Sequence, residues 1–178
     1  MLMLNDFYPI DNHRETDVIE TLRTIEKDVS CVLLDLQRPD ERETENIVSV
    51  ISNSLSCPIG ISHHYALPER PVFVPPIPPD MTAEKYLKSW KGQEIWLELS
   101  CECLYLSINN DGCMEVSTTE FSAPEHYHKS LICHYKIRKE QDRIFFAIYR
   151  TKEDNLALLE EAAQFGVTKG IGMWRDLA

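Results

Sequence analysis

Positive charge is scarce in this sequence. Its 18 Lys and Arg residues stand against 29 Asp and Glu residues, which gives a formal net charge of −11 at neutral pH. A field of this sign repels phosphate backbones and anionic headgroups, so we expect neither nucleic acid nor a membrane as a partner. No window approaches the roughly 20 apolar residues of a membrane span, and the first residues do not resemble a secretory signal. We therefore expect a cytoplasmic protein.

The chain also lacks the short motifs that identify several enzyme classes. It contains no Gly-x-Ser-x-Gly nucleophile turn, no phosphate loop and no dinucleotide fingerprint. These absences argue against esterase, kinase and dehydrogenase sites. Accordingly, we expect no cofactor.

Metal-binding patterns are missing as well. None of the six cysteines belongs to a Cys-x-x-Cys pair, and small buried apolar side chains are their simplest interpretation. Histidines cluster at 63–64, 126–128 and 134, but their spacings fit no zinc-binding pattern. We expect no metal site.

What the sequence does contain is an alternation of strand-like and helix-like segments. Apolar runs at 1–5, 31–37 and 59–64 are typical of strands, and apolar residues at helical spacing across 18–29 and 47–55 predict the intervening helices. This order favours a parallel sheet. The proline-rich segment 75–79 then predicts a rigid loop leading into a helix, because caps follow it directly.

The pattern changes in the second half of the chain. Segments 104–108 and 114–117 flank an Asn-Asn-Asp-Gly turn, which predicts a β-hairpin. Segments 132–137 and 143–149 predict a second hairpin with a longer loop, and 118–130 is expected to be an irregular loop. Further on, Thr151-x-x-Asp154 resembles a capping box, Gly166 predicts a helix stop, and a final strand follows at 167–174. The expected apolar face of this last helix consists of Leu156, Leu159, Ala162 and Ala163.

These elements predict a single α/β domain over residues 1–178. About eight strand candidates accompany four helices, so the hairpins replace some of the helices of a regular barrel. We expect a reduced or incomplete TIM-like (β/α) barrel with two inserted β-hairpins, since complete barrels usually need 200 or more residues. An open α/β sheet is the alternative.

The strand within Ser30–Asp40 indicates where a site would lie. Val32, Leu34 and Leu36 share one face, and Leu33, Asp35 and Gln37 share the other. In a barrel the aliphatic face packs under the helices, while the mixed face points inward near the active-site end. The same phase in other strands adds His64, Glu98, Ser100, Tyr149 and Trp174 to this inward set.

Two carboxylates and an aromatic floor suggest carbohydrate chemistry. Asp35 and Glu98 are the candidate catalytic residues, serving as acid and as nucleophile or base. The candidate substrate-binding residues are Gln37, His64, Tyr149 and Trp174, with Trp174 stacking on a sugar ring. The competing interpretation is a set of partly buried polar groups that only hydrogen-bond to one another.

A family resemblance points the same way. The stretches Val32-Leu-Leu-Asp-Leu-Gln-Arg-Pro39, 59–64 and 166–174 resemble parts of uncharacterised bacterial proteins. More distantly, the acid at Asp35 and the closing Trp174 resemble chitinase-like glycoside hydrolase barrels. That resemblance implies a site that binds or cleaves a small carbohydrate. The chain departs from the family pattern at Gln37, where another acid is expected.

A non-catalytic interaction or scaffold protein is the alternative function. The two predicted hairpins end in edges that could pair with a second copy, so a homo-oligomer is the expected partner in that case. Exposed aromatic residues at Tyr105, Phe121 and Tyr127 would favour it.

Overall fold

The computed structural model describes residues 1–5, 15–37, 42–100, 103–109, 114–119, 126–140 and 143–172. The chain forms two compact units. The first contains residues 1–74 and 92–96, and the second contains residues 75–91 and 97–178. Strand β5 (Ile95–Leu99) therefore begins in the first unit and ends in the second.

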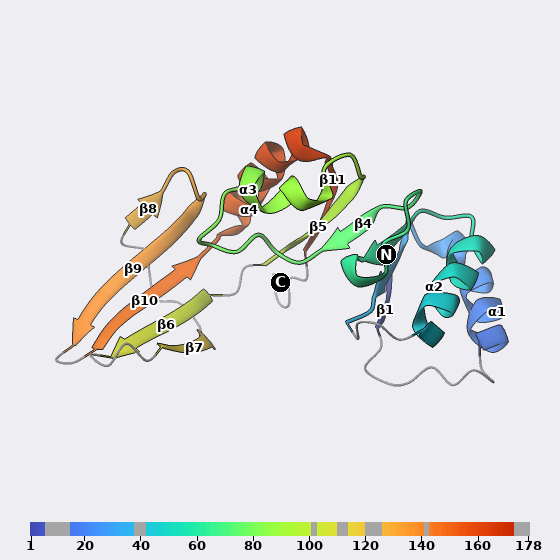
Figure 1. Ribbon diagram of the computed structural model, residues 1–178, viewed down its shortest axis with the longest axis horizontal. Coiled ribbons are helices and arrows are strands. Elements are labelled where there is room, and N and C mark those ends of the chain that lie inside the picture. Colours follow the sequence, from blue (N-terminus) through green and yellow to red (C-terminus); the bar gives the residue numbers. More distant parts are fainter. Residues whose placement is uncertain are drawn as a thin grey trace. The chain divides into compact units, whose positions relative to one another are not determined.

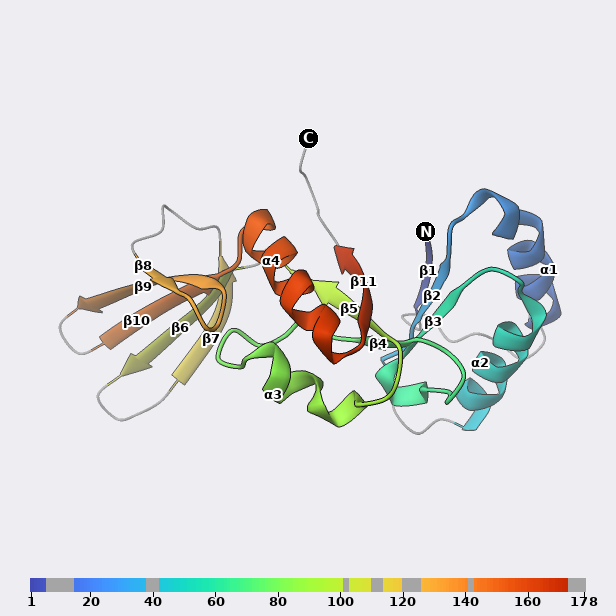
Figure 2. The ribbon, with the colours of Figure 1, turned by 90° about the horizontal axis from the view of Figure 1, so that it is seen from above.

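The first unit is built from strand–helix alternation, as the sequence pattern predicts. Its elements are β1 (Leu2–Asn5), α1 (Glu15–Ile25), β2 (Val32–Asp35), α2 (Arg42–Ser54), β3 (Ile59–Ser62) and β4 (Val72–Val74). The pairs β1–β2, β2–β3 and β3–β4 are parallel. Both helices lie on the same side of these strands (Figure 2).

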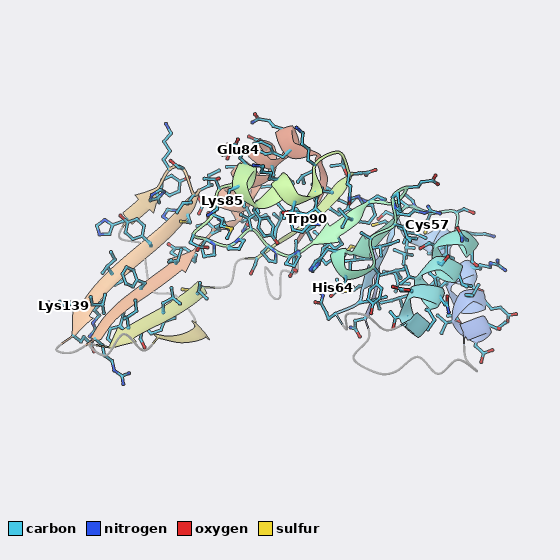
Figure 3. All side chains as sticks on the ribbon, viewed as in Figure 1. Cys57, His64, Glu84, Lys85, Trp90 and Lys139 are labelled. Atoms are coloured by element: carbon cyan, nitrogen blue, oxygen red, sulfur yellow. The ribbon has the colours of Figure 1, made fainter. Side chains whose placement is uncertain are left out.

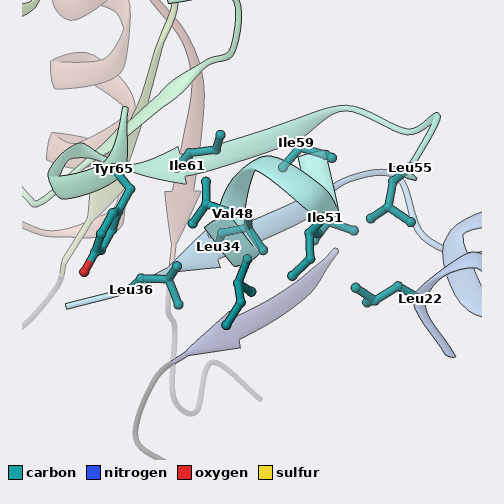
Figure 4. Close-up of a cluster of buried hydrophobic side chains, with 11 residues drawn as sticks. Leu22, Leu34, Leu36, Val48, Ile51, Leu55, Ile59, Ile61 and Tyr65 are labelled. Atoms are coloured by element: carbon teal, nitrogen blue, oxygen red, sulfur yellow. The ribbon is translucent and has the colours of Figure 1, made fainter. Parts of the chain in front are cut away.

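The core of the first unit lies between that side of the sheet and the helices (Figure 4). Val32, Leu34 and Leu36 pack there with helix residues such as Val48 and Ile51, and all five are almost fully buried. The predicted aliphatic face of β2 is therefore confirmed. Burial of such apolar area is the main force that holds the helices on the strands.

The opposite, mixed face of the first unit is filled in its middle by one aromatic ring. Trp96 on β5 is 2% exposed, and its ring lies over Gly60 on β3, where a Cβ atom would come within 2.2 Å of Trp96 Cε3. Gly60 pairs in register with Leu33, which is also buried. On the same face, Asn5 and Asp35, which pair in register, carry polar side chains at the carboxyl ends of β1 and β2.

The second unit combines helices with an antiparallel sheet (Figure 1). Its elements are α3 (Ala83–Leu87), the end of β5, β6 (Cys103–Asn109), β7 (Met114–Thr119), β8 (His126–His128), β9 (Cys133–Glu140), β10 (Arg143–Tyr149), α4 (Lys152–Ala162) and β11 (Val167–Gly172). Thr82 caps α3, and Thr151 and Asp154 form the predicted capping box of α4. Gly166, at φ 98°, ends the turn after α4 as predicted.

Both predicted hairpins are confirmed, and within the described residues they belong to one five-stranded sheet in the order β7-β6-β10-β9-β8. The prediction of an irregular loop over 118–130 is wrong at 118–119, where β7 still pairs with β6, and at 126–128, where β8 pairs with the start of β9. His-Tyr-His is too short a run for the alternation to be recognised. The rest of that segment includes Phe121, which lies outside the described residues.

One face of this sheet carries a grid of side chains that are apolar except for Lys139. The register aligns three rows across β6, β10 and β9, and residues aligned in this way share a face. The rows are Leu104–Ile148–Tyr135, Leu106–Phe146–Ile137 and Ile108–Ile144–Lys139. Ile137 and Ile144 are 47% and 39% exposed, and no described helix lies over the outer two rows (Figure 1).

Helix α4 buries Ala162 and half-buries Leu159 as predicted, but the rest of its buried face differs from the one its apolar spacing predicts. Asn155, Leu158 and Ala162 are buried, whereas Leu156 is 50% exposed. Asn155 faces inward because its side chain makes polar contacts there. Its Nδ2 donates hydrogen bonds to the carbonyl oxygens of Ser100 and Thr151, at 3.0 Å each. A buried amide thus fixes the rotation of the helix, and apolar spacing alone cannot show this.

The first sheet has the order β1-β2-β3-β4-β5-β11 over the described residues. Strands that follow chain order without reversal are typical of a barrel, whereas a doubly wound sheet reverses direction at a switch point. The fold is therefore α/β, with the strand order of an incomplete barrel. In the part of the chain that the structure describes, no helix has the length and apolar character needed to cross a bilayer.

Candidate functional site

Asp35 stands at the end of β2 and is the centre of a polar cluster in the first unit. It is half-buried, and its Oδ1 accepts a hydrogen bond from Nε2 of Gln37, two residues farther along. The two side chains share a face, as strand alternation predicts. The candidate site therefore has a carboxylate and an amide as neighbours rather than two acids.

Ser62 ties the end of β3 to this cluster. It is buried, and its hydroxyl donates a 2.6 Å hydrogen bond to the carbonyl oxygen of Leu36. The chain then turns through a 3₁₀ segment, His63–Tyr65, so that the rings of His63 and His64 lie 3.9 Å apart. The carboxyl ends of two adjacent parallel strands thus present polar groups together.

Electrostatics link His63 to Asp35. Burial lowers the pKa of His63 from 6.5, the neighbouring His64 lowers it further, and Asp35 opposes both effects. The net shift favours the neutral form of the His63 imidazole. A neutral imidazole, an amide and a carboxylate supply both donors and acceptors, which is what recognition of a hydroxyl-rich ligand requires.

The predicted site residues are distributed over both units. Asp35, Gln37 and His64 belong to the first unit, and Glu98 and Tyr149 belong to the second. Trp174 lies outside the described residues. The structure joins Asp35 to Gln37, whereas the pairing of Asp35 with Glu98 as catalytic residues stays a prediction.

The expected strand position of His64 needs correction. Strand β3 ends at Ser62, because the 3₁₀ turn begins at His63. His64 is exposed on that turn rather than placed on the mixed face by strand alternation (Figure 3). His63, which was not among the predicted site residues, is the half-buried imidazole near Asp35.

The second unit contains a cavity of about 240 Å³ that involves Tyr149. Its walls are the proline-rich segment 76–79, Ser100, Leu104 and residues 148–150. Segment 75–79 leads into α3, and Tyr86 on this helix donates a hydrogen bond to the carbonyl oxygen of Pro75 at 3.1 Å. The predicted rigid loop is thus one wall of a cavity.

Glu98 lies elsewhere in the second unit, on β5, and is half-buried. Its charge acts on Tyr86: burial raises the pKa of the Tyr86 hydroxyl, and Glu98 raises it further.

Tyr149 instead stacks on His134, with ring centroids 5.3 Å apart, and His134 Nε2 lies 3.3 Å from Asp154 Oδ2. Among the described residues, no group of three or more His, Cys, Asp or Glu side chains is placed to hold a metal ion.

Sequence reasoning missed Arg150, which lines the cavity beside Tyr149. A signal was available, because this cation directly follows the apolar strand 143–149 and directly precedes the capping box of α4.

Comparison with known proteins supports the fold. No protein-family model matches the chain, and no curated protein matches it. A crystal structure of the spore cortex-lytic enzyme SleL from Bacillus megaterium QM B1551 is similar, with a TM-score of 0.60 at 13% sequence identity. The similarity covers 97% of this chain and 55% of that enzyme, so the chain spans about half of the enzyme's length. At this identity the likeness concerns the fold alone.

Proposed function

We propose that this chain is a glycoside-hydrolase-like protein that binds a small carbohydrate at the carboxyl ends of β2 and β3. The observation that carries the proposal is the cluster of Asp35, Gln37 and His63 at these strand ends. Ligands of parallel α/β sheets bind outside the carboxyl ends of the strands. Fold similarity to a cortex-lytic enzyme adds support.

Binding is favoured over cleavage by the residue beside Asp35. Glycoside hydrolysis normally uses two carboxyl groups on either side of the scissile bond. Gln37 occupies the neighbouring position on the same face and already donates a hydrogen bond to Asp35. An amide can hold a sugar hydroxyl, but it cannot act as general acid, base or nucleophile at neutral pH.

Calorimetric titration with chitotetraose tests the binding proposal. We expect Asp35→Asn to weaken binding by about tenfold or more, since a hydrogen bond to a charged group contributes about 1.5–3 kcal/mol. Asp17→Asn is the matched control, because Asp17 is exposed on α1. The proposal fails if the unaltered protein shows no saturable heat with chitotetraose or with cellotetraose, or if both variants bind as it does.

Cleavage is tested separately by the release of reducing ends from the same oligosaccharides. If Asp35 and Glu98 act as a catalytic pair, either Asp35→Asn or Glu98→Gln alone abolishes the release. If the unaltered protein releases no reducing ends while binding persists, the protein is a carbohydrate-binding module without hydrolase activity.

A homo-oligomeric scaffold is the second candidate, and the apolar grid on the antiparallel sheet favours it. Contiguous exposed apolar side chains on a sheet face commonly mark an interaction surface. We expect light scattering to show a dimer or larger assembly that Ile137→Lys and Ile144→Lys dissociate. Leu156→Lys, on the exposed side of α4, is the control. A monomer at every concentration would remove this candidate.

A further inference from the structure

Arg150 is a buried cation at the wall of the cavity in the second unit. It follows β10 directly, and only 6% of its surface is exposed. Its guanidinium donates three hydrogen bonds to carbonyl oxygens: Nε to Ile132, Nη1 to Ile77 and Nη2 to Leu131. These bonds tie the proline-rich segment and the turn before β9 to one side chain.

Three carbonyl acceptors do not satisfy all the N–H donors of the Arg150 guanidinium. A guanidinium has five N–H donors, so one N–H on each terminal nitrogen has no acceptor among the described residues. No carboxylate in the described part of the chain forms an ion pair with Arg150. A buried charge without a partner of opposite sign is costly.

Asp154, the carboxylate whose charge acts on Arg150, is already engaged elsewhere. Burial lowers the pKa of Arg150, and Asp154 and Cys133 act in the opposite direction. However, Oδ2 of Asp154 lies against His134 Nε2 and accepts the backbone N–H of Thr151 at 2.8 Å. Asp154 therefore reduces the cost of the charge from a distance without binding it.

The cavity beside Arg150 is small and mostly apolar. Pro76, Pro78, Leu104 and Ile148 supply much of its wall, and each is partly exposed, so solutes can reach it. Its volume of about 240 Å³ is below the roughly 300–1,000 Å³ of pockets for drug-sized ligands. It therefore suits a compact molecule with an apolar body.

We propose that this cavity binds a small monocarboxylic acid. The carboxylate accepts hydrogen bonds from Arg150, and a compact ring or branched body packs between segment 76–79 and the side chains of Leu104 and Ile148. A carboxylate has the geometry to accept two N–H groups of one guanidinium, and such charge-assisted bonds are strong in a desolvated site. This site lies within the second unit and does not depend on the carbohydrate proposal.

A purely structural role for Arg150 makes a different prediction. If the three carbonyl bonds are its entire function, replacing Arg150 lowers stability but no anion binds at the cavity. The two accounts are therefore separated by anion binding rather than by the stability of a variant.

The test is an NMR titration of the ¹⁵N-labelled full chain with benzoate and with benzamide, which has the same ring but no charge. We expect benzoate to cause saturable shifts of the Leu104 and Ile148 amides and of the Arg150 Nε–H, and to bind at least about tenfold more tightly than benzamide. Arg150→Gln should abolish the shifts, whereas Arg143→Gln, on the exposed end of the same strand, should leave them unchanged.

If Arg150→Gln does not fold, Leu104→Trp is the second variant to test. Its larger side chain fills the cavity while the Arg150 guanidinium is kept. We expect it to abolish benzoate binding. The proposal is overturned if benzoate causes no saturable shift at these residues in the unaltered chain, if benzamide binds equally well, or if the folded Leu104→Trp variant still binds benzoate.

Discussion

Gly60→Ala should destabilise the first unit because Trp96 leaves no room for a methyl group. An added Cβ would lie 2.2, 2.7 and 3.0 Å from three atoms of the indole ring. Trp96 is 2% exposed and its Nε1 lies 3.3 Å from Glu94 Oε1, so the ring cannot move without losing packing. The strain is steric, since the structure gives Gly60 no positive φ.

The size of the effect follows from two opposing contributions. Overpacking a well-filled core costs about 1–3 kcal/mol, and contacts this short place the cost near the upper end. Replacing glycine by alanine restricts the unfolded chain, which returns about 0.4–1 kcal/mol. We therefore expect Gly60→Ala to lower the free energy of unfolding by about 2 kcal/mol.

A urea titration followed by far-UV circular dichroism measures this loss, and a double-mutant cycle identifies its cause. Trp96→Phe removes the part of the ring that meets the new methyl group, so the two substitutions should couple by about 1 kcal/mol or more. Gly170→Ala is a comparator, because its Cβ would meet the flexible ends of Leu99 and Leu159 and should cost less. If Gly60→Ala and Trp96→Phe were additive within about 0.5 kcal/mol, the steric explanation would be refuted.

Three further predictions concern stability. The pKa of His63 is lowered in the folded state, so the unfolded state takes up a proton at this histidine first as the pH falls. The free energy of unfolding should therefore fall as the pH drops below about 6.5. In urea titrations at several pH values, His63→Gln should flatten this slope. Thr151→Ala removes the hydroxyl that accepts the Asp154 N–H at 3.1 Å and should cost about 1 kcal/mol, measurable as a lower midpoint of thermal unfolding. Leu34 is 1% exposed and Leu156 is 50% exposed. Leu34→Ala should lower the free energy of unfolding by about 2–5 kcal/mol, whereas Leu156→Ala should change it by no more than about 0.5 kcal/mol. Similar values for the two variants would contradict the assigned core.

Much of the fold was predictable because it depends on local periodicity. The strand with Val32, Leu34 and Leu36 on one face, the two hairpins and the capping box at Thr151 each have a short-range signal. Strand β8 was missed because three residues carry too little pattern. The buried face of α4 was predicted only in part, at Ala162 and Leu159, because Asn155 turns the helix toward Ser100, a partner 55 residues away.

The candidate sites, like the fold, were predictable only where a local sequence pattern determines them. The shared face of Asp35 and Gln37 follows from strand alternation, and their hydrogen bond agrees with it. The half-buried imidazole is His63 rather than the predicted His64, because β3 ends in a 3₁₀ turn. Apolar patterning does not predict such a turn. The cavity at Arg150 could not be derived, since the guanidinium contacts a carbonyl 73 residues away. Such contacts depend on tertiary packing rather than on local spacing.

The most direct test of the carbohydrate proposal is an amide NMR titration of the full chain with chitotetraose. The proposal predicts saturable shifts at Asp35, Gln37 and His63 that Asp35→Asn abolishes, with the Asp17→Asn control unchanged. Shifts confined to residues away from the ends of β2 and β3, or no saturable shifts at all, would contradict it.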